Sequence, residues 1–308
     1  MEPKKIRNRR VLTANRFRAA LVQQFVLFTL LPCVLVVLGI GYAAFYARPT
    51  IVDAAIFVGM WFITGGLGIS VGFHRLLTHR SFKTFPTVET VLAIFGSMAG
   101  NGPVLYWVAV HRRHHQHSDG PHDPHTPCDE HGQCQSIAGL IRAHIGWTFE
   151  NEIPNPNVYA KDLKKKPWIQ WVNNHYLVIA VIGLIIPAII SFVLRPSPAH
   201  LISGFFYGGL LRLVVGNQLI WAVNSLCHAF GYRRHETHDS STNNWVLAVP
   251  TFGEALHNNH HAIPSSARFG TRWWEAITDS GYWSICLLEK AGWAWDVRTT
   301  NHAHKTQN

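Results

Sequence analysis

Apolar residues gather in five long blocks along the chain, and polar stretches that carry most of the charge separate them. Four blocks have about the 20 residues that a membrane-spanning helix needs, so we predict a helix in each. The fifth is broken by glycines, Asn101 and Pro103, which favours an interfacial or re-entrant helix over a crossing. The predicted spans are residues 24–47, 51–73, 176–194 and 201–226, and the interrupted block is residues 88–110.

The fourth predicted span contains polar side chains that would lie in or near the bilayer. Such groups are costly in lipid and usually face a cavity or a partner. We therefore expect Arg212, Asn217, Gln218 and Asn224 to line a cavity. The alternative for Arg212 is a purely structural pairing, or a side chain that extends toward the membrane surface.

The distribution of charge predicts the orientation of these helices. Of the 308 residues, 48% are hydrophobic and 14% charged, and the formal net charge is +10. Basic residues cluster before the first span and beside the others, which is typical of cytoplasmic flanks. Four crossings then place both termini and the regions 1–23, 74–175 and 227–308 in the cytoplasm. No linker divides the chain, so we expect one domain over residues 1–308, with a lipid bilayer but no nucleic acid as a partner.

The five cysteines form no paired framework. Cys128, His131 and Cys134 make a short cluster that could bind zinc. Only three ligands are local, however, whereas a structural zinc site takes four. We therefore expect a reduced surface loop here.

Histidines are the most informative residues, because eight of the twenty form three short clusters. Positions i, i+3 and i+4 share a helix face, so each H-x-x-H-H cluster can direct three imidazoles at one point. The two histidines of the first cluster lie about 140° apart on a regular helix. Either that helix unwinds between them or they serve different metals. The clusters are His74 and His79; His111, His114 and His115; and His257, His260 and His261.

Asn224 and His228 lie four residues apart and share a face of the fourth span. They bring the candidate set to nine histidines and one amide, enough for two metal ions. Imidazole suits iron, copper, zinc and nickel, and the predicted site is rich in nitrogen. A non-catalytic metal-binding membrane protein, a transporter and a bis-histidine haem protein are the alternatives, but the histidines gather at one face instead of along the spans.

The residues around the clusters form longer boxes. They read Gly72-Phe-His-Arg-Leu-Leu-Thr-His79, His111-Arg-Arg-His-His-Gln-His-Ser-Asp119, Gly253-Glu-Ala-Leu-His-Asn-Asn-His-His261 and Trp221-Ala-Val-Asn-Ser-Leu-Cys-His228. This combination resembles the integral-membrane fatty-acid desaturase family, in its acyl-CoA Δ9 (stearoyl-CoA type) branch, from about residue 50 to residue 298. The resemblance implies an all-α integral membrane fold: four transmembrane helices and a cytoplasmic helical cap that holds a histidine-rich di-iron site.

The resemblance also implies roles for individual residues. Asn224 would reach the second iron through water, and Trp147 and Trp107 would line the acyl channel with Arg212 and Gln218; the alternative for Trp147 is interfacial anchoring. The implied iron ligands are His74, His79, His111, His114, His115, His228, His257, His260 and His261. Polar neighbours that would orient these imidazoles, or else pack within loops, are His117, Asp119, Asp123, His125 and Glu254.

The implied activity is that of an oxidoreductase with two iron ions as cofactor and O2 as co-substrate. It would introduce a cis double bond into a saturated acyl chain, with CoA as the expected carrier and position nine as the expected site. No haem domain follows the third box, so a separate ferredoxin or cytochrome b5 type donor, with its reductase, would supply electrons. A related hydroxylase or acetylenase, and a desaturase of acyl carrier protein or phospholipid substrates, are alternatives. The segment 126–137 departs from the family pattern, which fits a different carrier or donor.

Overall fold

The computed structural model describes residues 10–13, 18–46, 48–149 and 152–299. The basic cluster from Lys4 to Arg9 and the two termini, which we predict to be cytoplasmic, lie outside the described residues.

The described chain is mostly helical, with two antiparallel sheets of two strands each. The long apolar part consists of α2 (Arg18–Phe25), η2 (Val26–Leu30), α3 (Leu31–Tyr46), α4 (Ile51–Trp61), η3 (Phe62–Thr78), α10 (Tyr176–Leu194), α11 (Pro198–Gly204), η6 (Phe205–Leu211) and α12 (Arg212–Leu226). The remaining helices are α5 (Pro86–Ser97), α6 (Val104–His117), α7 (Ile137–His144), η4 (Gly146–Phe149), α8 (Pro156–Tyr159), η5 (Leu163–Lys165), α9 (Pro167–Asn174), α13 (Trp245–Ala248), α14 (His257–Ala262), α15 (Trp273–Thr278) and α16 (Ser280–Lys290). Strand β1 (Val11–Thr13) pairs with β3 (Glu152–Pro154), and β2 (Lys83–Thr84) pairs with β4 (Ala294–Trp295).

Four continuous helices are long and apolar enough to cross a membrane, which confirms the predicted number. The third matches the prediction from end to end, while the second continues to Thr78 and the fourth begins at Pro198. Large apolar side chains such as Val37 and Val193 are about 70% exposed, as expected for surfaces that face lipid. The four candidate spans are Leu21–Gly41, Ile51–Thr78, Tyr176–Leu194 and Pro198–Leu226.

The interrupted apolar block forms two helices instead of the single interfacial or re-entrant helix that we predicted, and the break between them lies at the glycines, Asn101 and Pro103. Helix α5 ends at Ser97 and α6 begins at Val104. Between them, Gly100 (φ +74°) and Gly102 (φ +97°) adopt backbone conformations that L side chains rarely adopt. With 12 and 14 residues, these helices are about 18 and 21 Å long, shorter than the ~30 Å hydrocarbon core. Neither is therefore long enough to cross.

Arg212 does not line a cavity, so the prediction for this residue is wrong. Its buried guanidinium donates to the carbonyls of Gly208 (3.2 Å), Met98 (3.1 Å) and Gly183 (3.0 Å). These contacts join the fourth span, the third span and the turn after α5. A buried cation needs such partners, and here backbone oxygens supply them. The structural alternative is the one observed.

Asn217 is also used in packing, contrary to the prediction that it lines a cavity. Its amide donates to the Phe28 carbonyl (3.1 Å) and accepts from Asn101 (2.9 Å). It thereby joins the first and fourth spans to the turn before α6.

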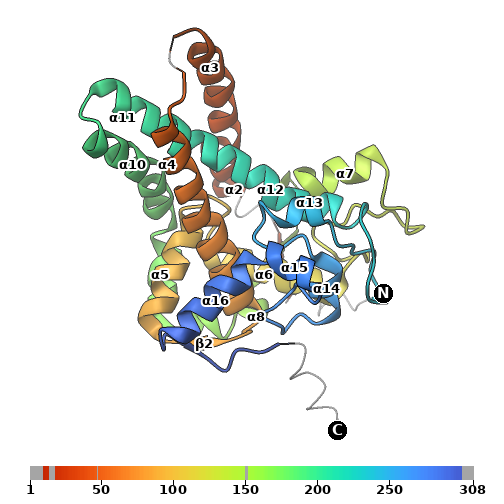
Figure 1. The fold of residues 1–308 in the computed structure, drawn as a ribbon. Helices are drawn as coiled ribbons and strands as arrows, with labels where there is room; N and C mark the ends of the chain where they lie inside the picture. The colour runs from red at the N-terminus through yellow and green to blue at the C-terminus, as the bar shows by residue number, and fades with distance from the viewer. Residues whose placement is uncertain (1–9, 14–17, 47, 150–151, 300–308) are drawn as a thin grey trace.

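The polar half of the molecule packs around the lower end of the second span. Figure 1 shows α3, α10 and α11 projecting from one end, with α6, α8 and α14 to α16 gathered at the other. Phe73 and Leu77 of η3, Leu92 of α5, Val108 of α6 and Ile285 of α16 belong to one buried apolar cluster. This core fixes the ends of η3 and α6, which carry the first two histidine clusters.

Candidate metal centre

Nine histidines from four segments of the chain come together where the second and fourth spans meet the polar half. Their ring nitrogens form two groups, and within each group the atoms lie within 4.8 Å of one another. The first group is His74, His79, His111, His115 and His260, and the second is His114, His228, His257 and His261. All nine are the histidines that the sequence motifs single out as ligands.

Both histidines of the first cluster lie in one group because the helix that carries them is wound as a π-helix. Residues Phe62–Thr78 form a π-helix, and the backbone N–H of His79 donates to the carbonyl of His74 (3.1 Å). A hydrogen bond over five residues brings positions i and i+5 onto neighbouring points of one face. The structure agrees with the first alternative, because a π-helix is unwound relative to an α-helix, and it contradicts the second, because both histidines join the same group.

Each H-x-x-H-H triplet is divided between the groups, contrary to the expectation that it points at one spot. In α6, His111 and His115 join the first group while His114 joins the second. In α14 the division is reversed, since His257 and His261 join the second group while His260 joins the first. The i, i+4 pair of each helix shares one face, and the remaining histidine points to one side of it.

Four of the histidines hold a carboxylate through Nδ1, the arrangement that fixes the orientation and tautomer of a metal-binding imidazole. A ring that donates its Nδ1–H keeps an unprotonated Nε2 as the free ligand atom. The pairs are His114 Nδ1 with Asp123 (3.0 Å), His228 Nδ1 with Asp119 (3.0 Å), His261 Nδ1 with Asp239 (2.6 Å), and His74 Nδ1 with Glu254. Three of these carboxylates were predicted to orient the ligands, and Asp239 was not.

Asp119 shows how such a pair is stabilised. Burial opposes ionisation of this carboxyl, but the neighbouring His228 lowers its pKa to about 2. One oxygen also accepts from the Ser240 N–H (2.6 Å), and the other from the Thr126 hydroxyl (2.7 Å). In return the carboxylate raises the pKa of His228, although burial acts in the opposite direction. Asp119 is thus a fully ionised hydrogen-bond acceptor for the imidazole.

The remaining rings are held neutral, which is the form that binds metal. Burial, followed by the charge of neighbouring histidines, holds the pKa of five rings well below the ordinary value. They are His79, His111, His115, His257 and His260.

The chemistry of the donor set fits a pair of cations. His114 and His261 both give their Nδ1–H to aspartates, yet their Nε2 atoms lie 3.2 Å apart. In neutral rings no proton lies between these two lone pairs, and a bound cation would satisfy both. In the first group, the buried Nε2 of His79 has no hydrogen-bond partner among the described residues. An orphaned buried acceptor of this kind calls for an explanation, and a metal ion provides one.

Two joined cavities lead past the histidines. They have volumes of about 100 and 50 Å³ and share Trp107, His111, Ile220 and Asn224 in their walls. Trp147 also lines the first, and Trp61 also lines the second. Most of the lining is apolar or aromatic, as suits an acyl chain. Trp107 and Trp147 therefore line the space as predicted.

Asn224 lines both cavities, and the second of them is also lined by His111 of the first histidine group and His257 of the second. Of the four polar residues of the fourth span that we expected to line a cavity, Asn224 is the one that does so in these two cavities. Gln218 does not, because its side chain is exposed and accepts from His144 Nε2 (3.0 Å).

Two of the predicted orienting residues behave differently. His125 packs against the His114 ring (4.4 Å) and against Trp147 (5.5 Å), and burial lowers its pKa to about 3. It lies with His114 and Asp123 in a further group of possible metal ligands. His117 belongs to none of the groups found among the described residues, and its ring lies against His122 (5.5 Å).

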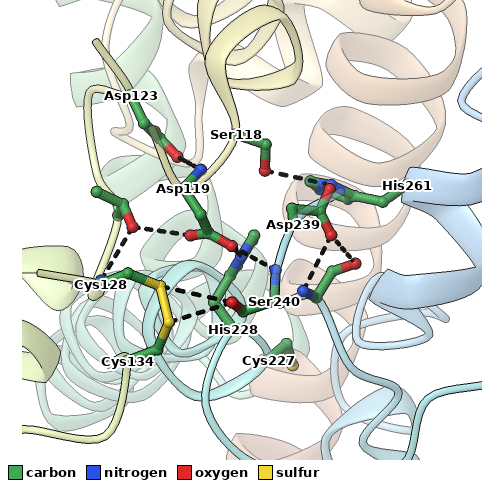
Figure 2. Close-up of polar contacts among 12 residues, drawn as sticks. Ser118, Asp119, Asp123, Cys128, Cys134, Cys227, His228, Asp239, Ser240 and His261 are labelled. Carbon is green, nitrogen blue, oxygen red and sulfur yellow. Dashed lines mark hydrogen bonds and ion pairs between the residues drawn. A yellow bond between two sulfur atoms is a disulfide. The ribbon is translucent and has the colours of Figure 1, made fainter. Parts of the chain in front are cut away.

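The cysteine loop differs from its prediction. Cys128 and Cys134 form a disulfide, so the loop is not reduced and offers no pair of thiolates for zinc. His131 is exposed beside Glu130. Figure 2 shows the disulfide next to Ser240 and the Asp119–His228 pair.

Asp239 and Arg75 are the residues that the sequence motifs missed. Asp239 lies in the loop between α12 and α13, and no helical spacing relates it to a histidine box. Arg75 was hidden within the first box; its buried guanidinium bonds Asp279 (2.8 Å) and Glu254 (3.4 Å), so it holds the carboxylate that contacts His74. The one available signal was the position of Arg75 beside a candidate ligand.

The comparison with protein families agrees with this geometry. The model of the family described as "Fatty acid desaturase" matches residues 49–276. The chain belongs to the fatty acid desaturase family. This desaturase is therefore an oxidoreductase of lipid metabolism, and its histidine groups are compatible with the iron centre of the family. The acyl-CoA Δ9 branch within the family stays a prediction.

Characterised relatives of this desaturase differ in their substrates. A hex-5-enoyl-[acyl-carrier protein] acetylenase from Moorena producens (strain JHB) is 38% identical over 300 residues, which cover 96% of this chain and 92% of the relative. An sn-1 stearoyl-lipid 9-desaturase from Synechocystis is 40% identical over 78% of this chain and 71% of the relative. An acyl-CoA C20 Delta5-desaturase from Anemone leveillei is 36% identical over 80% and 74%.

Proposed function

We propose that this protein is an O2-dependent desaturase that introduces a cis double bond into a saturated fatty acyl chain. The observation that carries the proposal is that both histidine groups line the second apolar cavity, the first through His74 and His111 and the second through His257. The nine histidines would hold two iron ions, and Asn224 would reach one of them through water.

Bound iron supplies the activation of O2 that an unactivated C–H bond requires and that no side chain can provide. The reaction consumes one O2, two electrons and two protons, removes two hydrogens from adjacent methylenes, and releases two waters. The electrons come from a separate ferredoxin or cytochrome b5 type donor with its reductase.

The residues of the chain position both reactants. The carboxylates hold four of the imidazoles in one tautomer, which leaves the Nε2 of each free to bind metal. The tryptophan-lined cavities exclude water and confine the acyl chain, so that one methylene pair lies beside the metal ions. Trp107 stacks on His111 at 5.2 Å and thereby forms both a cavity wall and a support for a ligand.

The expected acyl carrier is CoA and the expected position is nine. Relatives act on acyl-CoA, on lipid-bound acyl chains and on acyl carrier protein, and two of the names specify position nine or five. The polar half with its histidines would face the cytoplasm, where soluble electron donors are available.

The second candidate is an acetylenase, which uses the same oxidant on a chain that already has a double bond. It is favoured by the acetylenase match, which extends over 96% of the chain while the desaturase matches quoted above cover 78–80%.

Expression in a host that lacks this activity, followed by gas chromatography of its fatty acids, tests the proposal. A new cis monoene supports it, and the location of the bond assigns the position. An alkyne would favour the acetylenase, and a hydroxylated product would favour a hydroxylase. Purified protein given stearoyl groups on CoA, carrier protein or phospholipid then identifies the carrier. Iron-loaded protein that leaves all three unchanged with an active donor would refute the desaturase proposal.

A further inference from the structure

The Cys128–Cys134 disulfide lies beside the second histidine group and has no part in the proposed reaction. The Ser240 hydroxyl lies 3.7 and 3.2 Å from the two sulfurs, and it must be the donor because disulfide sulfurs carry no hydrogen. The Ser240 N–H donates to Asp119 Oδ2 (2.6 Å), which also pairs with His228 Nδ1 (3.0 Å). Figure 2 shows this continuous path from the sulfurs to the imidazole.

A second path reaches the other oxygen of the same carboxylate. The Cys128 N–H donates to the Thr126 hydroxyl (2.9 Å), which donates to Asp119 Oδ1 (2.7 Å). Beyond the disulfide, the Gln135 amide donates to the carbonyl of Ala229 (2.9 Å), the residue that follows the histidine of this path. The closed loop therefore holds both oxygens of Asp119 and the backbone beside its imidazole partner.

A groove beside the disulfide gives a reductant a route to it. Most of the loop from residue 129 to residue 137 is exposed and Cys128 is half-buried, while Cys134 is buried. Cys134 nevertheless lines an open groove of about 640 Å³, together with Ser240, Arg233 and His228. A small dithiol that enters this groove therefore lies beside both Cys134 and His228.

We propose that Cys128 and Cys134 form a reversible thiol–disulfide switch that controls how firmly Asp119 holds His228, and thereby how tightly the second histidine group retains iron. This inference rests on the proposed function, because it requires iron at that group. The proposal gives the segment 126–137, which has no part in the reaction, a role in sensing the thiol redox state.

The chemistry is ordinary thiol–disulfide exchange. A thiolate of a dithiol reductant attacks one cysteine sulfur, breaks the S–S bond and forms a mixed disulfide, which the second thiol of the reductant then resolves. Two electrons and two protons pass to the protein as two thiols, and the reductant leaves as its own disulfide. On the cytoplasmic face proposed above, dithiols are abundant and protein disulfides are typically transient. Reduction opens the loop and loosens both contacts to Asp119.

The test uses purified full-length protein loaded with iron and held in lipid nanodiscs. Samples equilibrated with oxidised or reduced dithiothreitol are alkylated, and mass spectrometry reports the state of Cys128 and Cys134. In parallel, iron release to a coloured chelator is followed over time. We expect the pair to be oxidised in the first buffer and reduced in the second, with release of about half of the iron accelerated 10–100-fold on reduction, the usual effect of disturbing a group that orients a metal ligand.

Two variants isolate the switch from direct effects of dithiothreitol on iron. C128S/C134S should release iron at the fast rate in both buffers, whereas C286S, which removes a free cysteine of α16, should respond as the wild type does. If the double variant does not fold, C128S takes its place, because it also cannot form the disulfide and therefore still separates reduction from a direct effect of dithiothreitol on iron. Thiols that stay reduced in the oxidised buffer, or equal release rates in the two buffers, would overturn the switch. Protein that binds no iron in either buffer would instead count against the proposed function.

Discussion

Replacement of Asp239 by asparagine is the sharpest test of the second histidine group. Asp239 Oδ2 lies 2.6 Å from His261 Nδ1. Its Oδ1 accepts from the Thr237 hydroxyl (2.8 Å) and from the Ser241 backbone N–H (3.0 Å). Although burial opposes ionisation, His261 and these donors hold the pKa of Asp239 well below its ordinary value, so the carboxylate is charged at any pH where the protein is assayed.

In D239N, the two donors keep the amide oxygen at the Oδ1 position, because the Ser241 N–H cannot turn away. The amide NH2 then faces His261 Nδ1, which must become an acceptor and send its proton to Nε2. A protonated Nε2 no longer binds a metal. Loss of the charge alone weakens the contact by about 1.4 kcal/mol, or tenfold, and the change of tautomer adds to this. We expect iron retention at the second group to fall about 100-fold, the upper end of the range for such contacts.

The assay is iron release to a chelator from purified protein, together with iron content and activity. D296N is the matched control, because Asp296 is exposed and pairs only with Lys83 on the surface in the described contacts. We expect D296N to retain two irons and D239N to retain about one. A D239N protein that binds two irons as tightly as the wild type would refute the assignment of His261 as a ligand held by Asp239.

Three further predictions follow from the geometry. Replacement of His114 or His260 by alanine should abolish turnover while membrane extraction shows the chain still inserted, and substantial product from either variant would contradict its role as a ligand. Burial opposes ionisation of Asp162, but bidentate contact with Arg112 (2.7 and 3.2 Å) lowers its pKa to about 2. The resulting stabilisation is fully present at about pH 5 and is lost as the pH falls through 2, so the Tm difference between wild type and D162N should shrink steadily over that interval. A difference at pH 2 as large as that at pH 5 would contradict the argument. Replacement of Trp61, which lines the second cavity, by alanine enlarges that cavity and should shift product chains toward greater length in gas chromatography. An unchanged distribution would show that Trp61 does not limit the length of the acyl chain.

The histidines could be predicted from the sequence because their spacing reports local helical geometry. Box residues such as His111 and His115 lie on one helix, and the pattern of i, i+4 survives in the structure. The spacing of His74 and His79 did not show that both side chains lie on one face, because the prediction assumed a regular α-helix and the chain here forms a π-helix. Asp239 could not be found, since its pairing depends on how a loop closes over α14 and on no periodicity in the chain.

The apolar blocks predicted four helices well because burial in lipid demands length and little else. The polar residues inside the fourth block were harder to interpret. Arg212, Asn217 and Asn224 look alike in sequence, yet two join helices through backbone carbonyls and the third lines a cavity. Which role each takes depends on the face that it presents to neighbours, and that follows from tertiary packing.

The two H-x-x-H-H helices, α6 and α14, each contribute histidines to both groups, so that a few segments of the chain are enough to build two groups. Helix α6 gives two rings to the first group and one to the second, and α14 gives one to the first and two to the second. The two short helices therefore cross-link the groups, and a shift of either helix disturbs both at once. The other three histidines, His74, His79 and His228, lie at or just beyond the ends of the second and fourth candidate spans. If the groups hold iron as proposed, the spacing of the two ions would depend on how α6 and α14 pack against each other.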